Sequence, residues 1–280
     1  MSLLVFGSSG QVAAALRKIA PDAEFLDRNA ADLSNPAACA AAIRIACPSV
    51  VINAAAYTAV DNAEKEEVLA TVVNGHAPGA MAQACAELGI PFLHVSSDYV
   101  FDGSGQRPWP PGAPISPLNA YGRSKAAGEA AVRAARGPHA ILRTSWVFSA
   151  TGKNFVTTML RLSETRDTLK VVDDQIGGPT PAQSIAETLL QIADKMLAGH
   201  EGGTYHYAGA PATTWKSFAR EIFARAPRAV EVTGIATADY PTPAQRPLNS
   251  RLDCSALETD FGIPPPDWRR ALDDIVKELT

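Results

Sequence analysis

Short apolar runs alternate with longer segments of helical composition along the first half of the chain. Strands are predicted at 3–6, 23–27, 49–55, 91–97 and 140–145, and helices at 11–19, 36–46, 61–70, 74–88 and 121–136. Strands separated by helix-length segments need crossover connections, which give a parallel sheet with helices on both faces. The pattern therefore predicts an α/β fold built on a doubly wound parallel sheet.

The pattern loosens after about residue 150. Helices predicted at 153–165, 181–198 and 215–225 are interrupted by the proline-rich and glycine-rich segments GGPTP, YPTPAQRPLN and GIPPPDW. Such interruptions are typical of a smaller, loop-rich cap rather than a second regular sheet. We predict a first domain over 1–150 and mainly a cap over 151–280, with some of its elements returning to the first domain and a ligand at the interface.

Composition narrows the class of protein. With 46% hydrophobic residues, 19% charged residues and a net charge of −4, neither disorder nor a basic nucleic-acid surface is expected. No apolar run approaches the roughly 18 residues of a membrane span, and no basic signal region precedes LLVFG. The four cysteines form no CxxC pair or zinc spacing, which favours buried thiols. We expect a soluble, cytoplasmic protein without nucleic-acid or membrane partners.

A glycine loop, FGSSGQV (6–12), follows the first strand and opens the first helix. Backbone N–H groups at such a helix start can bind a pyrophosphate. Gly7 would permit the tight turn and Gly10 a close approach of the phosphates, while Ala13 stands where the fingerprint allows glycine or alanine. Although Gly-Ser-Ser-Gly is also an ordinary turn sequence, its position predicts a Rossmann-type dinucleotide site.

Asp27 ends the second strand, 20 residues after Gly7, where a carboxylate commonly bonds the adenine ribose. Arg28 follows it directly. Aspartate repels the 2′-phosphate of NADPH, whereas arginine accepts it, so the choice between NADH and NADPH stays open. The alternative for Asp27 and Arg28 is a solvated turn.

The segment NAYGRSKAAGE (119–129) places Tyr121 four residues before Lys125 on a predicted helix, so their side chains share one face. The pair alone decides little. A free phenol is a poor acid–base group at neutral pH, and a nearby cation lowers its pKa. We therefore expect the charge of Lys125 to lower the pKa of Tyr121, so that the phenol can exchange a proton with a substrate oxygen.

Two further strand ends fall in the crevice where open α/β sheets bind ligands. HVSSDYVF (94–101) places Ser96, Ser97 and Asp98 at the end of the fourth strand, where a hydroxyl can bond the substrate oxygen or the phenol. NAAAYTAVD (53–61) ends the third strand with small residues at 54–56 that leave room for a cofactor. Plain close packing would explain these alanines equally well.

The glycine loop, NAAA, SSD and YGRSK occur in the order in which they occur in the extended short-chain dehydrogenase/reductases, which this chain resembles. Longer runs resemble, within that family, the dTDP-4-dehydrorhamnose reductases. These runs, which extend over nearly the whole chain, are NAAAYTAVDNAE, SSDYVF, SPLNAYGRSKAAGE, RTSWVF, DDQIGGPTP and YPTPAQRPLNSRL.

The resemblance implies a role for each matching residue. Tyr121 matches the catalytic acid, Lys125 the residue that binds the nicotinamide ribose, and Ser97 the hydroxyl that bonds the reacting oxygen. Cofactor contacts are implied at Gly10, Gln11, Val12, Asp32, Leu33, Ala56, Tyr57 and Thr58, in addition to those already expected at Gly7, Asp27, Arg28, Ala54 and Ala55. Contacts to a dTDP-sugar are implied at Ser97, Asp98, Tyr121 and Trp146, although a lone tryptophan would otherwise be assigned to the core.

At three positions the resemblance leaves a role open or the chain departs from the family pattern. Arg246 in AQRPLNSRL is a candidate for the substrate diphosphate, with a surface salt bridge as an equal alternative. Family members have been described as dimers joined through magnesium held by acidic side chains, but this chain has Ala15 and Gln183 at two such positions. Because magnesium prefers carboxylate oxygen, we expect neither the metal nor that dimer, but a monomer or a weak homodimer.

The resemblance implies that NADPH or NADH reduces the C4 keto group of dTDP-4-dehydro-β-L-rhamnose. A sugar-nucleotide epimerase or dehydratase is an alternative with the same fold, which would keep its cofactor and return the hydride. A non-catalytic partner is another, since the regulatory β-subunit of methionine adenosyltransferase resembles these reductases. The intact SSD and YGRSK motifs favour an enzyme.

Overall fold

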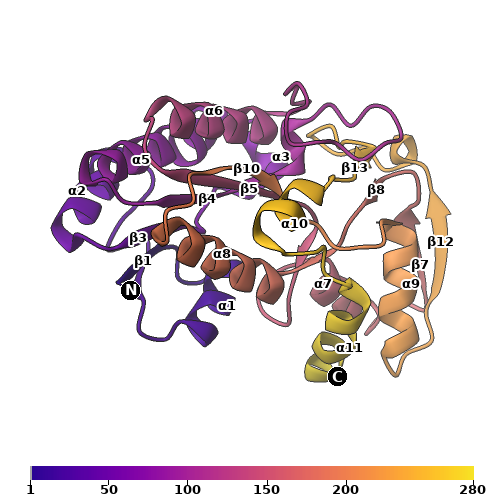
Figure 1. Ribbon diagram of the computed structural model, residues 1–280. Helices are drawn as coiled ribbons and strands as arrows, with labels where there is room; N and C mark the ends of the chain where they lie inside the picture. The colour runs from indigo at the N-terminus through magenta and orange to yellow at the C-terminus, as the bar shows by residue number, and fades with distance from the viewer. Residues whose placement is uncertain (1) are drawn as a thin grey trace.

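The computed structural model describes residues 2–280 and is built around a six-stranded parallel sheet. The strand order is β10-β5-β4-β3-β1-β2 (Figure 1). The bounds are β1 (Leu3–Phe6), β2 (Glu24–Leu26), β3 (Val50–Asn53), β4 (Phe92–Ser97), β5 (His139–Thr144) and β10 (Gly202–His206). Every strand pair in the sheet is parallel, so the predicted α/β, doubly wound Rossmann class is confirmed.

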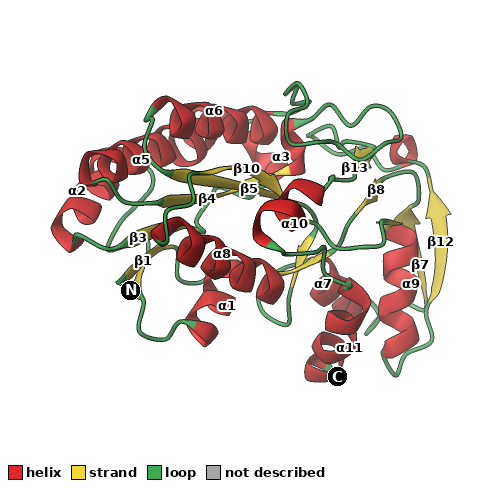
Figure 2. Ribbon diagram, viewed as in Figure 1, coloured by secondary structure: helices red, strands yellow, loops and turns green. Residues whose placement is uncertain are grey.

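Helices cover both faces of this sheet (Figure 2). Side chains alternate along β1: Leu3 and Val5 join the core beneath α1 (Gln11–Ile19) and α8 (Ala182–Leu197), while Leu4 and Phe6 join the core on the other face. That second layer contains α2 (Pro36–Ala46), α5 (Ala77–Leu88) and α6 (Ala120–Ala134). Burial on both faces explains why β1 is a continuous apolar run.

The strand order reverses at β1, which lies between β2 and β3. Connections from the carboxyl ends of β1 and β3 diverge there, leaving a crevice at the edge where open α/β sheets bind ligands. The chain beyond β3 is less regular than predicted. In place of a helix over 61–70 it forms α3 (Val60–Ala63) and α4 (Glu67–Thr71), followed by a π-helical turn η1 (Val72–His76) that leads into α5.

The second half contains more regular structure than the sequence predicts. Its core joins α7 (Phe155–Leu162), α9 (Trp215–Arg225) and α11 (Trp268–Leu279) to a parallel pair formed by β7 (Thr168–Val172) and β12 (Glu231–Ile235). The remaining elements are short: β6 (Val147–Phe148), β8 (Ile176–Gly177), β9 (Thr180–Pro181), β11 (Thr213–Thr214), η3 (Thr237–Asp239), β13 (Asn249–Ser250) and α10 (Ser255–Phe261).

Two elements beyond residue 150, α8 and β10, belong to the layers of the main sheet. The domain boundary itself stays a prediction. Three of the cysteines are buried, as expected, whereas Cys47 is exposed at the end of α2. No helix within residues 2–280 combines the length and the apolar character needed to span a membrane.

Candidate active site

The glycine loop connects β1 to α1 by a sharp turn. Gly7 has φ +104°, a conformation that side chains disfavour, and its N–H donates to Leu26 O at 2.9 Å. A Cβ on Gly7 would lie 3.3 Å from Ala55 N, which is tight. Gly10 precedes α1 without a side-chain cap, so the first N–H groups of the helix are left for an anionic ligand.

A pocket of about 600 Å³, here called the loop pocket, opens beside this turn. Its walls contain the predicted adenosine-side residues together with the glycine loop, namely Gly7, Gly10, Asp27, Arg28, Asp32, Leu33, Ala54, Ala55, Ala56, Tyr57 and Thr58. Asp27 Oδ1 accepts the N–H groups of Asn29 and Ala30, each at 2.9 Å. The exposed Arg28 pairs with Asp32 at 3.3 Å. Asp27 and Arg28 thus lie in an exposed turn that also forms a pocket wall.

A second pocket of about 560 Å³, here called the tyrosine pocket, shares part of its wall with the first. The shared residues are Ser9, Gly10, Ala54, Ala55, Ala56 and Thr58, so the two pockets form one cleft along the carboxyl edge of the sheet. The predicted residues that line this part of the cleft are Gln11, Val12, Ser97, Asp98, Tyr121, Lys125 and Trp146.

Close packing fixes α6, the helix that carries Tyr121 and Lys125. Asn119 caps its start by accepting the Gly122 N–H at 2.8 Å. Two glycines then allow the helix to touch neighbouring backbone: a Cβ on Gly122 would collide with the carbonyl of Tyr99, and one on Gly128 with the carbonyl of Asn74. The glycines of the YGRSKAAG run therefore serve close approach rather than flexibility.

Tyr121 is half-buried and meets the ring of Tyr99 edge-on, with 5.5 Å between ring centroids. Burial raises the pKa of Tyr121 to about 12, which the neighbouring Ser97 hydroxyl partly offsets and the Asp98 carboxylate reinforces. The prediction that Lys125 lowers the pKa of this phenol is wrong for the structure. The reason is that burial dominates and that the ammonium makes its contacts elsewhere.

Lys125 is almost fully buried. Its Nζ donates to the carbonyl of Val95 at 2.7 Å and lies 3.4 Å from His94 Nε2, both on β4. Burial lowers the pKa of Lys125 to about 8, and the charge of Glu129 opposes that shift. The lysine therefore faces the back of the tyrosine pocket and holds its proton loosely.

Two buried oxygens of the tyrosine pocket have no hydrogen-bond partner within the described part of the chain: Asp98 Oδ2 and Thr144 Oγ1. Asp98 follows β4 in the short turn η2 (Asp98–Val100), and its Oδ1 accepts the Ser97 hydroxyl at 3.0 Å. Burial raises the pKa of Asp98 to about 6. Buried polar atoms rarely stay unpaired, so these two are natural contacts for a bound ligand.

Trp146 and Arg246 differ in their surroundings. Trp146 lies in the tyrosine pocket, has φ +48° and stacks on Trp215 with 3.5 Å between ring centroids, so it is not a plain core residue. Arg246 lies outside both pockets and pairs with Asp61 at 2.9 Å. The salt-bridge alternative for Arg246 is the one found in the structure, and its contact with a diphosphate stays a prediction.

Ala15 and Gln183 line a separate groove between α1, α8 and α11. Between residues 2 and 280, no three histidine, cysteine, aspartate or glutamate side chains gather in a way that could hold a metal ion.

Some residues of the tyrosine pocket were not identified from the sequence, notably Tyr99, Thr144 and Lys153. Tyr99 and Thr144 lie inside the quoted motifs SSDYVF and RTSWVF, so the motifs themselves contained a signal. Lys153, in a loop before α7, carries no such signal.

Comparisons with known proteins agree with this geometry. The dTDP-4-dehydrorhamnose reductase of Sinorhizobium fredii is 44% identical over 289 aligned residues, covering 100% of this chain and 98% of that protein. The crystal structure of a dTDP-4-dehydrorhamnose reductase from Clostridium acetobutylicum has a TM-score of 0.93 at 35% identity, covering 100% of this chain and 99% of that one. A dTDP-4-dehydrorhamnose reductase from Bacillus anthracis, solved in complex with NADP, also gives 0.93, at 32% identity over 99% of this chain and 100% of that one.

The resemblance seen in the sequence motifs is thereby confirmed. A family model described as RmlD substrate binding domain matches residues 1–280, and the chain belongs to that family.

Proposed function

We propose that the protein reduces the C4 keto group of dTDP-4-dehydro-β-L-rhamnose with NADPH or NADH, forming dTDP-L-rhamnose. The observation that supports this most strongly is the single cleft that joins the glycine loop to Ser97, Tyr121 and Lys125, in a chain similar over its whole length to dTDP-4-dehydrorhamnose reductases.

The cleft suits a nicotinamide dinucleotide, which supplies the hydride when bound. The uncapped N–H groups at the start of α1 would bind its pyrophosphate, and Gly7 keeps the turn beside them narrow. The free oxygen of the exposed Asp27 suits the ribose diol of NADH, and the exposed Arg28 suits the 2′-phosphate of NADPH. Since both face the loop pocket, we propose that either coenzyme binds.

Tyr121 acts as the proton donor in this proposal. A phenol whose pKa is raised to about 12 is fully protonated at neutral pH, which is the form a general acid needs. An alkoxide is more basic than a phenolate, so proton transfer from Tyr121 becomes favourable as the carbonyl oxygen gains negative charge. The Ser97 hydroxyl beside the phenol would hold that oxygen in place.

The sugar nucleotide would contact the groups that line the tyrosine pocket without partners of their own. Asp98 Oδ2 and Thr144 Oγ1 are placed to bond sugar hydroxyls, and Trp146 offers an aromatic edge. For Arg246 to reach a diphosphate, its guanidinium would have to leave Asp61.

The test is a stoichiometric absorbance assay at the reduced-nicotinamide band, run with the keto-rhamnose nucleotide and each coenzyme in turn. One coenzyme oxidised per sugar reduced is the expected result. An epimerase or dehydratase would convert sugar without net coenzyme oxidation, and a non-catalytic partner would convert none, so either outcome would overturn the proposal. Monomeric or weakly dimeric assembly and a cytoplasmic location stay predictions, the former testable by light scattering.

A further inference from the structure

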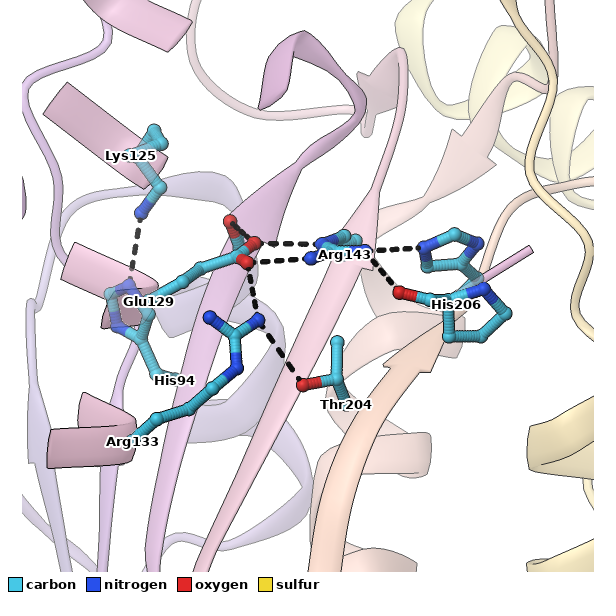
Figure 3. A network of polar contacts seen from close by, with 9 residues as sticks. His94, Lys125, Glu129, Arg133, Arg143, Thr204 and His206 are labelled. Carbon is cyan, nitrogen blue, oxygen red and sulfur yellow. Dashed lines mark hydrogen bonds and ion pairs between the residues drawn. The ribbon is translucent and has the colours of Figure 1, made fainter. Parts of the chain in front are cut away.

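His94 lies directly behind Lys125, on the strand that ends in the SSD motif. It is fully buried and its ring stacks on Phe92. Figure 3 shows Lys125 reaching down from α6 to the His94 ring. Burial and the charge of Lys125 hold the pKa of His94 well below its usual range, so the imidazole is neutral and carries one N–H.

The buried Asn53, at the end of β3, decides which nitrogen carries that hydrogen. Its Oδ1 accepts the backbone N–H of Ala55 at 3.1 Å, which fixes the orientation of the amide. Its Nδ2 therefore faces His94 Nδ1, at 3.2 Å. Because an amide nitrogen only donates, His94 Nδ1 must accept. The single hydrogen of the imidazole is left on Nε2.

His94 Nε2–H points at Lys125 Nζ, 3.4 Å away. An ammonium has three donors and no acceptor, so it meets this N–H as a second donor, whereas an amine has a lone pair that can accept it. The 3.4 Å separation is long for a hydrogen bond, as expected if the lysine is charged and both nitrogens are donors.

The ammonium has three N–H donors, and the other described groups around it do not supply an acceptor for each of them. On β4, Val95 O accepts one bond at 2.7 Å. On the lysine's own helix, both oxygens of the Glu129 carboxylate already accept bonds, from Ser96 at 2.7 Å, from Arg143 at 2.8 and 2.7 Å and from Arg133 at 2.8 Å (Figure 3). Tyr121, one turn earlier on that helix, is a neutral phenol.

We propose that Asn53 and His94 are positioning residues that present an N–H rather than a lone pair to Lys125, so that the ammonium is disfavoured and the lysine gives up its proton readily. The chain of polar contacts Ala55–Asn53–His94–Lys125 thus links the wall of the cofactor cleft to the proton affinity of the lysine. Its catalytic meaning rests on the reductase activity proposed above, in which the phenol of Tyr121 must regain a proton after each turnover and Lys125, which lines the same pocket, is the proposed source.

The direct test is the tautomer of His94 in the nucleotide-free protein, read from long-range 1H–15N correlations of the imidazoles. His206 is a matched internal control, since Arg143 Nη1 donates to its Nε2 at 3.2 Å and its Nδ1 donates to Trp109 O at 2.9 Å. The two rings should show opposite tautomers: Nε2–H for His94 and Nδ1–H for His206. Nδ1–H in His94 would overturn the inference. Loss of one of the five imidazole signal sets in His94→Gln assigns the resonances of His94, and loss of one set in His206→Gln assigns those of His206.

A second measurement tests whether His94 lowers the proton affinity of Lys125 or only packs against it. In His94→Gln, the amide oxygen can accept from the ammonium, so the midpoint of the pH dependence of NADPH affinity should rise by about one pH unit. An unchanged midpoint in the folded variant would contradict the tuning role. In Asn53→Asp, a carboxylate oxygen would accept from His94 Nδ1–H, and the tautomer of His94 alone should reverse.

None of these measurements uses the sugar nucleotide. Nε2–H on His94 in a protein without keto-sugar turnover would therefore overturn the proposed function and leave this inference standing. Nδ1–H in an active reductase would overturn the inference alone.

Discussion

The ion pair between Arg143 and Glu129 offers a sharp test of how the catalytic helix is held. Arg143 on β5 is 1% exposed and Glu129 on α6 is 0% exposed. Their two hydrogen bonds, at 2.8 and 2.7 Å, join the sheet to the helix that carries Tyr121 and Lys125. The same guanidinium donates to Pro111 O at 2.9 Å and so also ties down the segment that leads to α6.

The substitution Arg143→Met keeps most of the volume but leaves the Glu129 carboxylate with only Ser96 and Arg133 as donors. Breaking a buried pair from one side typically costs about 3–5 kcal/mol, because a charge stays buried without its partner. Arg133, with a side chain 38% exposed, offsets part of this, so we expect a loss of about 3 kcal/mol in the free energy of unfolding.

Urea denaturation, monitored by circular dichroism, measures this loss as a lower midpoint concentration of urea with an unchanged m-value. The matched control is the double variant Arg143→Met/Glu129→Leu, which removes both charges and should recover most of the stability. The reasoning is refuted if Arg143→Met stays within about 1 kcal/mol of the wild type, or if the double variant is no more stable than the single one.

Three further predictions concern the same cleft. Gly128→Ala should destabilise the protein by about 2 kcal/mol or more, since its Cβ would collide with the carbonyl of Asn74; a wild-type melting temperature would contradict this. Burial raises the pKa of Asp98 from its ordinary value of 3.8 to about 6 in the folded protein, so the free energy of unfolding falls as the pH rises through 6 and the buried carboxyl loses its proton. Asp98→Asn should therefore gain stability relative to the wild type at pH 7.5 and less at pH 5, as chemical denaturation at both values will show. Lys125→Met should weaken NADPH binding, measured by fluorescence titration, and lower turnover; unchanged values of both would remove it from the site.

The main sheet was predictable because its strands are apolar on both faces and leave continuous runs in the sequence. β10 was not, since GGTYH begins with two glycines and Tyr205 is the only residue of this strand with a largely apolar side chain. The helix α11 was also missed, although Trp268, Leu272 and Val276 recur every four residues and form its buried face. The surrounding fold sets β10, whereas the apolar repeat that specifies α11 was present in the sequence.

The candidate site, like the fold, was predictable from the sequence only in part. The motifs identified most of the residues that line the two pockets, because strand ends and helix starts converge at one edge of a parallel sheet. The direction of the Tyr121 pKa shift was not predictable, since it depends on how deeply the phenol is buried and on Lys125 turning to Val95. Nor does spacing reveal that Asp61 pairs with Arg246, 185 residues later.

The most direct measurement is the turnover of Tyr121→Phe with the keto-rhamnose nucleotide and NADPH, alongside its NADPH affinity. If the Tyr121 phenol donates the proton, the variant should bind NADPH like the wild type while kcat falls by roughly 100-fold or more. A Tyr121→Phe variant that turns over at the wild-type rate would show that the proton comes from another group.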